Sequence, residues 1–119
     1  MISAKLDANA KTVAEFLTLM GNEKRLSIMN HLAGGELSAG LLAERVLLSH
    51  SALSQHLAKL RAFGLVDIRR DGKMIYYFCS SGAARELLAM LDSFLATERP
   101  LAGSGPHYVA ERIRRLRVA

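Results

Sequence analysis

The segment at residues 48–60 reads Leu48-Ser49-His50-Ser51-Ala52-Leu53-Ser54-Gln55-His56-Leu57-Ala58-Lys59-Leu60. Leu53, Leu57 and Leu60 recur at helical spacing, so they predict a helix with one apolar stripe. Ser49 stands where its hydroxyl can cap the first turn of that helix. The rest of the helix is largely polar. This pattern predicts a helix that is buried on one side and presents hydrogen-bonding groups on the other.

A β-hairpin is predicted a few residues further along the chain. Residues 65–68 and 74–78 are short runs rich in branched and aromatic side chains, and Asp71-Gly72 lies between them. Asp-Gly between two such runs is a strong hairpin signal. Arg69, Arg70 and Lys73 lie at or next to the predicted tip, so the hairpin is basic.

Helical patterns account for most of the remaining sequence. Asn22 and Ser38 are placed to cap two further helices, and Gly34-Gly35 ends the first of these. The predicted helices lie at about residues 13–20, 23–33, 39–46 and 50–62, with a long one from Ser80-Ser81-Gly82 to before Pro100. The predicted fold class is therefore mainly α with a small β-hairpin, a winged helix-turn-helix in the order α-α-α-α-β-β-α.

Length and composition favour one compact domain. The chain has 119 residues, half of them hydrophobic, and we expect a single domain over residues 1–98. Residues 99–119 form a basic tail, in which Val109, Ile113 and Leu116 are spaced to allow an extra C-terminal helix. No apolar run approaches the roughly 18 residues of a membrane-spanning helix, so we expect a cytoplasmic protein without a membrane partner.

The charge pattern favours double-stranded DNA as the partner. The net charge is +5, and cations gather on the predicted hairpin and its neighbouring helices. In a helix-turn-helix the second helix enters the major groove. The candidates on this recognition helix are Ser49, His50, Ser51, Ser54, Gln55, His56 and Lys59. The candidates for the phosphate backbone and the wing are Arg45, Arg61, Arg69, Arg70 and Lys73.

These motifs resemble the ArsR/SmtB family of bacterial repressors. The resemblance runs over about residues 13–96, rests on residues 48–61 and on the hairpin from Ile68 to Tyr77, and is greatest to the nodulation and haemolysin regulators. It implies a homodimer that places one recognition helix in each half of a near-palindromic operator. The expected dimer interface comprises Val13, Phe16, Leu17, Leu87, Leu88, Leu91 and Leu95.

The sensing chemistry of that family is not matched. Metal-sensing members resembling this chain carry cysteines after a Glu-Leu pair, whereas Glu36-Leu37 is followed here by Ser38. The positions of the paired sensor thiols hold Asn30 and Ala96. We therefore expect no metal and no cofactor, and the identity of a small-molecule or redox effector stays open. The single cysteine, Cys79, is expected to be a buried small side chain.

Three functions remain open from the sequence. The first is a sequence-specific transcriptional repressor that binds its operator as a homodimer. The second is an effector-free architectural DNA-binding protein, and the third is a winged helix that binds another protein. An enzyme is not expected, because the sequence has no Gly-rich phosphate loop, no nucleophile arrangement and no cluster of metal ligands.

Overall fold

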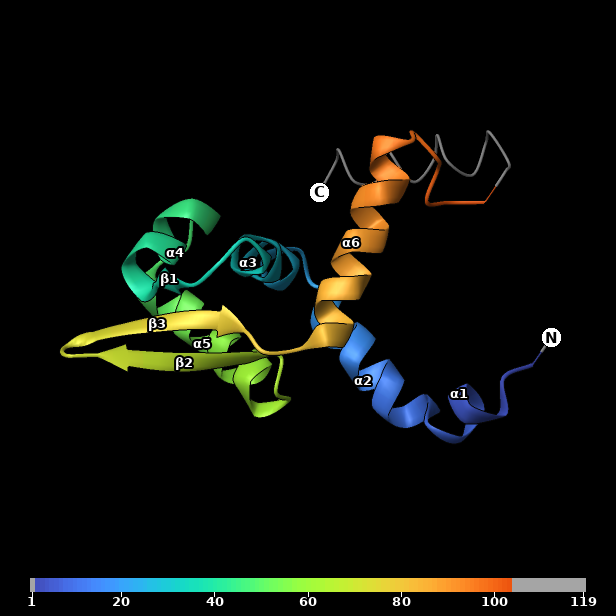
Figure 1. Cartoon of the computed structure of the whole chain (residues 1–119), viewed down its shortest axis with the longest axis horizontal. Helices are drawn as coiled ribbons and strands as arrows, with labels where there is room; N and C mark the ends of the chain where they lie inside the picture. The colour runs from blue at the N-terminus through green and yellow to red at the C-terminus, as the bar shows by residue number, and fades with distance from the viewer. Residues whose placement is uncertain (1, 104–119) are drawn as a thin grey trace. The chain divides into compact units, whose positions relative to one another are not determined.

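The computed structural model describes residues 2–103 (Figure 1). The chain divides into two units, Met1–Arg85 and Glu86–Ala119. The elements in chain order are α1 (Ala4–Ala8), α2 (Ala10–Met20), α3 (Glu23–Ala33), β1 (Leu37–Ser38), α4 (Ala39–Val46), α5 (His50–Ala62), β2 (Val66–Asp71), β3 (Met74–Cys79) and α6 (Gly82–Ala96). The predicted fold class is confirmed: a mainly helical chain with a small antiparallel sheet.

Side-chain caps fix where the helices begin. Asn22 Oδ1 accepts a hydrogen bond from the backbone of Arg25 at 3.0 Å, and Ser38 Oγ accepts one from Leu41 at 3.3 Å. Ser49 Oγ accepts a bond from Ala52 at 3.2 Å. Each of these bonds satisfies a backbone donor that the first helical turn leaves free. The three predicted caps are confirmed.

The sheet has one more strand than the predicted hairpin. Its order is β1-β3-β2, and the two residues of β1 pair with Tyr77 and Tyr76 of β3. A two-residue strand has no alternating pattern, so the sequence could not reveal it. Gly72 has a φ of +60° in the two-residue loop between Asp71 and Met74, which is the conformation that favours glycine there.

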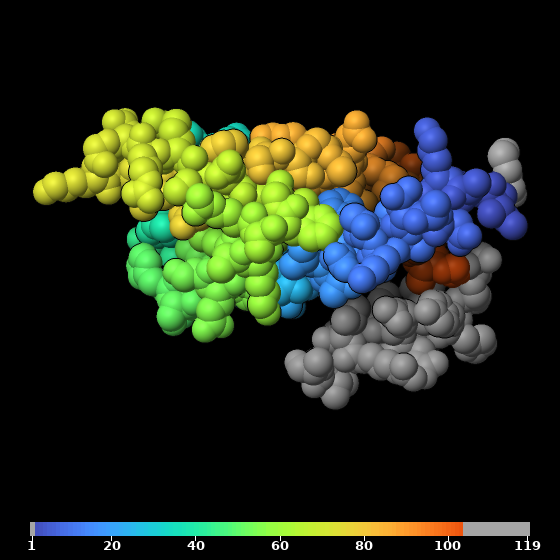
Figure 2. Space-filling model, turned by 90° about the horizontal axis from the view of Figure 1, so that it is seen from below, coloured from blue at the N-terminus to red at the C-terminus, as the bar shows by residue number. Residues whose placement is uncertain are grey.

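The core lies between helices α3, α4 and α5 and the base of the hairpin. Its fully buried large side chains are Ile28, Met29, Leu32, Leu42, Leu53, Leu60 and Val66. Beyond this core the hairpin formed by β2 and β3 projects past α4 and α5 (Figure 1), and Figure 2 shows its tip protruding beyond these helices. The tip is therefore accessible to a partner molecule that lies against α4 and α5.

Three basic side chains bind the carboxyl ends of helices. Lys24 Nζ donates to the Val46 carbonyl at 2.9 Å, and Arg25 Nε donates to the Leu19 carbonyl at 2.8 Å. Arg85 donates to the carbonyl oxygen of Ala33, at the end of α3, at 3.3 Å, and also to that of Cys79, at the end of strand β3, at 2.9 Å. Cations are favourable at these positions because helix C-termini carry partial negative charge. Part of the net positive charge thus serves the fold.

Other differences from the sequence prediction lie near the two ends. Helix α1 was not predicted, because its five residues bury no side chain and show no clear periodicity. The extra helix predicted within residues 99–119 falls mostly outside the described residues. Helix α6 occupies the predicted position, and Ala84 is its only buried residue.

Candidate DNA-binding surface

Helix α5 has the two-sided character that the sequence predicted. Leu53, Leu57 and Leu60 are at most 3% exposed and anchor the helix to the core. Ser51 and Gln55 are exposed and lie four residues apart, so they share one face. His50, Ser54 and Lys59 are exposed as well. The outer face of α5 therefore presents hydroxyl, amide and ammonium groups to solvent, and each of these groups can bind base edges or phosphates.

The start of α5 is held rigidly. Ser49 caps the helix through Oγ and lies 3.3 Å from the hydroxyl oxygen of Ser51. Before it, Leu47 adopts a left-handed conformation with a φ of 56° and ends α4. The bond from Lys24 to Val46 fixes the same joint from α3. These contacts set the angle at which α5 leaves α4.

His56 is distinct from the other predicted residues of α5. Its side chain is half-buried, and burial lowers its pKa below the ordinary value. The positive charges of Arg25 and Lys59 lower the pKa of His56 further. The imidazole is therefore neutral at pH 7, so it adds no positive charge to the outer face.

Two cations near the hairpin tip are available to a partner. Arg70 and Lys73 are exposed, and neither lies within 4.0 Å of a carboxylate among residues 2–103. In the register of β2 and β3, Arg70 pairs with Ile75 and lies on the same face as the buried Val66. The face of the hairpin that carries Arg70 is thus continuous with the core side of the sheet.

Arg69 lies on the opposite face and already has partners. Its guanidinium donates to both Glu36 carboxylate oxygens, at 2.9 and 2.6 Å, and lies 4.7 Å from the centre of the Tyr76 ring. The hydrogen bond from Arg69 lowers the pKa of Glu36, and the same bond raises the pKa of Arg69. Asp71 adds a weaker contact at 3.9 Å. Arg69 thereby links the loop before β1 to β2 across β3.

The other predicted phosphate contacts are on the surface. Arg61 lies 3.7 Å from Asp67, and both side chains are more than half exposed. A pair this exposed contributes little and leaves the cation accessible. Arg45 is exposed near the end of α4.

The residues predicted for a dimer interface have unequal exposure. On α2, Leu17 is 50% exposed, whereas Val13 and Phe16 are half-buried. The ring of Phe16 lies 6.5 Å, centre to centre, from the ring of Phe63 in the same chain. On α6, Leu95 is 62% exposed and Met90 is 50% exposed, while Leu87, Leu88 and Leu91 are half-buried. Both helices keep apolar side chains in contact with solvent.

Sequence reasoning missed the residues that support this surface. The partner of Lys24 is Val46, 22 residues further along the chain, and the partner of Glu36 is Arg69, 33 residues further along. Tyr76 meets Arg69 across the pair of strands β2 and β3. In the sequence, the Glu-Leu pair at 36–37 is informative only because no cysteines follow it. An acidic residue before β1 and an arginine on β2 carry no local signal of their pairing.

Three further observations on residues 2–103 bear on function. No three His, Cys, Asp or Glu side chains there gather closely enough to hold a metal ion. Across the same residues, no helix has the length and apolar character to cross a membrane. Cys79 is buried at 3% exposure, and its thiol donates to the Ser81 carbonyl at 3.5 Å. The prediction that Cys79 is a buried small side chain is confirmed.

The fold and the exposed helix define the class. A capped helix pair, α4 and α5, followed by a projecting β-hairpin is the winged helix-turn-helix architecture of DNA-binding regulators. Residues 22–67 match the model of the bacterial regulatory proteins of the arsR family. The chain is 46% identical over 99 residues to the nodulation protein NolR of Rhizobium meliloti, covering 78% of this chain and 81% of the relative. It belongs to the arsR family, which confirms the resemblance seen in the sequence.

Three further similarities agree with that assignment. The transcriptional activator HlyU of Vibrio cholerae is 40% identical over 87 residues, covering 73% of this chain and 81% of HlyU. The crystal structure of NolR from Sinorhizobium fredii matches with a TM-score of 0.70 at 45% identity, covering 79% of this chain and 94% of NolR. A homodimeric winged helix-turn-helix DNA-binding domain, Mb0332 from Mycobacterium bovis, matches with a TM-score of 0.69 at 26% identity, over 87% of this chain and 97% of that one.

Proposed function

We propose that the protein is a cytoplasmic, non-enzymatic transcriptional repressor that binds a near-palindromic operator as a homodimer. The observation that carries the proposal is the exposed polar face of α5, with Ser51 and Gln55 at its centre and three buried leucines behind it. A helix anchored in this way can enter a major groove without losing its packing.

Gln55 is proposed as the main base-reading residue. Its amide has both a donor and an acceptor and can pair with the N6 and N7 positions of an adenine. Ser51 and Ser54 offer hydroxyl groups on the same exposed side, and His50 is close to the N-terminal end that enters the groove. His56 is assigned a supporting role because it is half-buried and neutral.

Cations at two places supply affinity without sequence preference. Arg45, Lys59 and Arg61 are exposed on α4 and α5, where they can contact phosphates beside the groove. Arg70 and Lys73 extend this charge along the hairpin, which can contact a neighbouring groove. Arg69 is proposed to hold the hairpin in position through Glu36 and to contact a DNA phosphate at the same time.

Dimerisation is proposed through α2 and α6. Leu17 and Leu95 expose 50% and 62% of their surface, and removal of such side chains from water favours association. The homodimeric state of Mb0332 supports dimerisation, whichever helices form the interface. Two copies related by a two-fold axis would offer two α5 helices to half-sites about one helical turn apart.

The test is selection of bound duplexes from a random pool by the purified full chain, followed by transcription in vitro from a promoter that contains the selected site. Enrichment of an inverted repeat together with reduced transcription is the expected result. Increased transcription would contradict repression and would make the protein an activator, as HlyU is. Unselective binding would favour the architectural function, and no binding would favour a protein-binding winged helix.

A further inference from the structure

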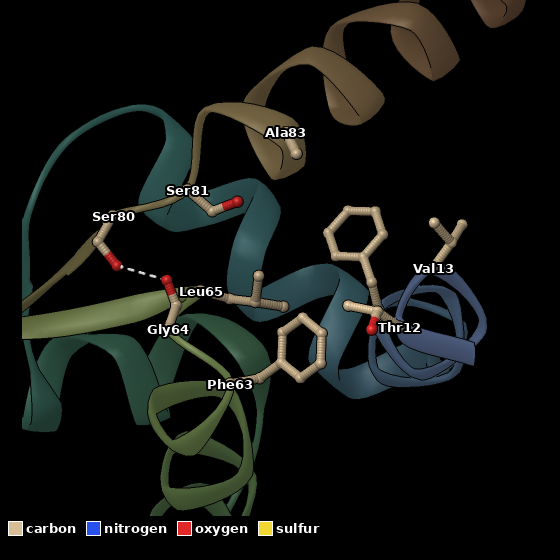
Figure 3. Close-up of a pocket in the computed structure, with 9 residues that line it drawn as sticks. Thr12, Val13, Phe63, Gly64, Leu65, Ser80, Ser81 and Ala83 are labelled. Atoms are coloured by element: carbon tan, nitrogen blue, oxygen red, sulfur yellow. Dashed lines mark hydrogen bonds between the residues drawn. The ribbon is translucent and has the colours of Figure 1, made fainter. Parts of the chain in front are cut away.

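An open cavity lies beside the C-terminal end of α5. Its volume is about 440 Å³, which is within the range of roughly 300–1,000 Å³ of small-molecule sites. Residues of α2, of the turn between α5 and β2, and of the junction between β3 and α6 line it. All of these belong to the first unit of the chain, residues 1–85. Figure 3 shows Phe63 directed toward α2, from which Thr12 and Val13 project.

The wall of the cavity is aromatic and aliphatic. Phe16 and Phe63 lie 6.5 Å apart with their rings tilted by 33°, and Val13 and Leu65 complete the apolar lining. Ring pairs at this distance and tilt leave aromatic faces and edges that a further ring can stack against. An apolar wall of this kind excludes a strongly hydrated ligand.

Three hydroxyl groups provide the polar contacts. Ser80 Oγ donates to the Gly64 carbonyl at 2.9 Å, so its lone pairs can still accept (Figure 3). Ser81 Oγ accepts from the backbone of Ala84 at 3.1 Å, so its proton can still be donated. Thr12 contributes a third hydroxyl on an exposed turn of α2. No lining residue is acidic, basic or a histidine.

We propose that this cavity binds a small, uncharged, largely aromatic molecule that carries a hydroxyl or carbonyl group. Aromatic surface matches the walls, and one polar group matches the hydroxyls of Ser81 and Thr12. A charged group would lose its hydration without gaining an opposite charge. The cavity supplies an effector site to a chain in which the family's metal and thiol positions are not matched.

The position of the cavity couples it to the DNA-binding helix. Phe63 follows Ala62, the last residue of α5, and Gly64 then turns the chain with a φ of +84°. A ligand packed against both Phe16 and Phe63 contacts this helix end and α2 together. Any preference of the ligand for one arrangement of the two helices shifts the equilibrium between them. This coupling rests on the proposed DNA-binding function, whereas the binding site itself does not.

The binding site is tested on the full-length protein without DNA. Labelled protein is titrated with 1-naphthol, and the amide signals of Thr12, Gly64 and Ser81 are followed by NMR. Saturable shifts of these signals are expected, and the anion of 1-naphthoic acid should bind about tenfold more weakly or worse because its charge finds no partner. Absence of saturable shifts, or equal binding of the anion, would overturn the proposal.

Variants of Thr12 locate the bound probe. Thr12→Phe should raise the Kd for 1-naphthol about tenfold or more by filling the cavity, and Thr12→Val should raise it about two- to tenfold by removing one hydrogen bond. Thr18→Phe and Thr18→Val are matched controls on the same helix, because Thr18 is exposed and does not line the cavity. Wild-type affinity in Thr12→Phe would contradict the assignment.

A second copy of the chain is the competing occupant, because Val13 and Phe16 line the cavity and also belong to the predicted dimer interface. If it fills the cavity, wild-type dimers will not respond to the probe, and the response will appear only in a monomeric variant such as Leu17→Glu. That result would overturn the proposal.

Regulation is tested separately: saturating 1-naphthol should change the Kd for the selected duplex more than about threefold, and an unchanged Kd would contradict the coupling. If the protein binds no DNA, the proposed function fails while the titration without DNA still decides the site.

Discussion

Arg69 and Glu36 are joined by two parallel hydrogen bonds, from Nε to Oε2 at 2.9 Å and from Nη2 to Oε1 at 2.6 Å. Both side chains are partly exposed, so the pair competes with water and with any phosphate that approaches the hairpin. The pair therefore helps to hold the hairpin in place, and it lowers the positive charge that Arg69 can offer to DNA.

Glu36→Gln is expected to strengthen binding to duplexes of any sequence. Loss of the carboxylate frees Arg69 for a phosphate, so the slope of log K against log salt should steepen by up to about one unit. Fluorescence anisotropy over a range of salt concentrations measures this. Glu15→Gln is the control variant, because it removes the same negative charge from α2, at a distance from the hairpin in sequence. An equal response in both variants would show that net charge alone is responsible.

The Glu36 pair also has a defined pH dependence. Arg69 lowers the pKa of Glu36, so the stabilisation by this pair is complete above the ordinary pKa of 4.5 and disappears as the pH falls through the lowered value. The protection factors of the β2 and β3 amides against hydrogen exchange should fall over that interval in the wild type, and Glu36→Gln should lack that fall.

Gln55→Ala is expected to relax specificity at one base position in each half-site. Loss of a bidentate contact with an adenine costs about 1–3 kcal/mol of discrimination. Competition between the selected duplex and single-base variants of it measures this cost. Ala58→Ser, on an exposed position of the same helix, is a control for changes that leave Gln55 intact. An equal loss of affinity on every duplex would contradict the base-reading role.

Arg70→Ala is expected to weaken binding to all duplexes to a similar degree. Arg70 lies near the tip of the hairpin without a carboxylate partner among the described residues, so it is assigned to phosphate. The slope of log K against log salt should become shallower by about one unit. Lys11→Ala on α2 removes one charge elsewhere. A change confined to one base position would instead place Arg70 among the specificity residues.

His56→Gln is expected to alter how stability depends on pH. Burial lowers the folded-state pKa of His56 below 6.5, so the unfolded chain binds the proton more tightly. Wild-type stability should therefore fall as the pH drops from about 6.5 toward that lowered pKa, and the variant should lose this component. Urea unfolding at pH 7.5 and 5.5 compares the two proteins. His50→Gln is the control, because His50 is exposed on the same helix.

Leu47→Asn is expected to stabilise the domain. Leu47 has a φ of 56° and is 82% exposed, so its side chain gains little from burial while its backbone is strained. Asparagine tolerates this conformation, and the gain should be about 0.5–1 kcal/mol in urea unfolding. Leu41→Asn, inside α4 and 39% exposed, should destabilise instead. A loss of stability in Leu47→Asn would show that Leu47 contributes a contact that outweighs the strain.

The predictable part of this fold was encoded over short distances along the chain. Asn22, Ser38 and Ser49 cap helices through bonds to residues three positions ahead, and Leu53, Leu57 and Leu60 define a buried face by spacing alone. Such signals depend on one turn of helix or one hairpin, so they can be read without the rest of the molecule.

The sequence by itself determined the helix order, the hairpin, the outer face of α5 and the family. Only the tertiary structure decided that Arg69 is held by Glu36, that Lys24 fixes the end of α4, and that Phe16 pairs with Phe63 beside a cavity. It also added β1, whose two residues form a strand only because β3 lies beside them. The physical reason is that these contacts join residues 22 to 47 positions apart. Such contacts depend on the packing of whole elements, which local propensity does not specify.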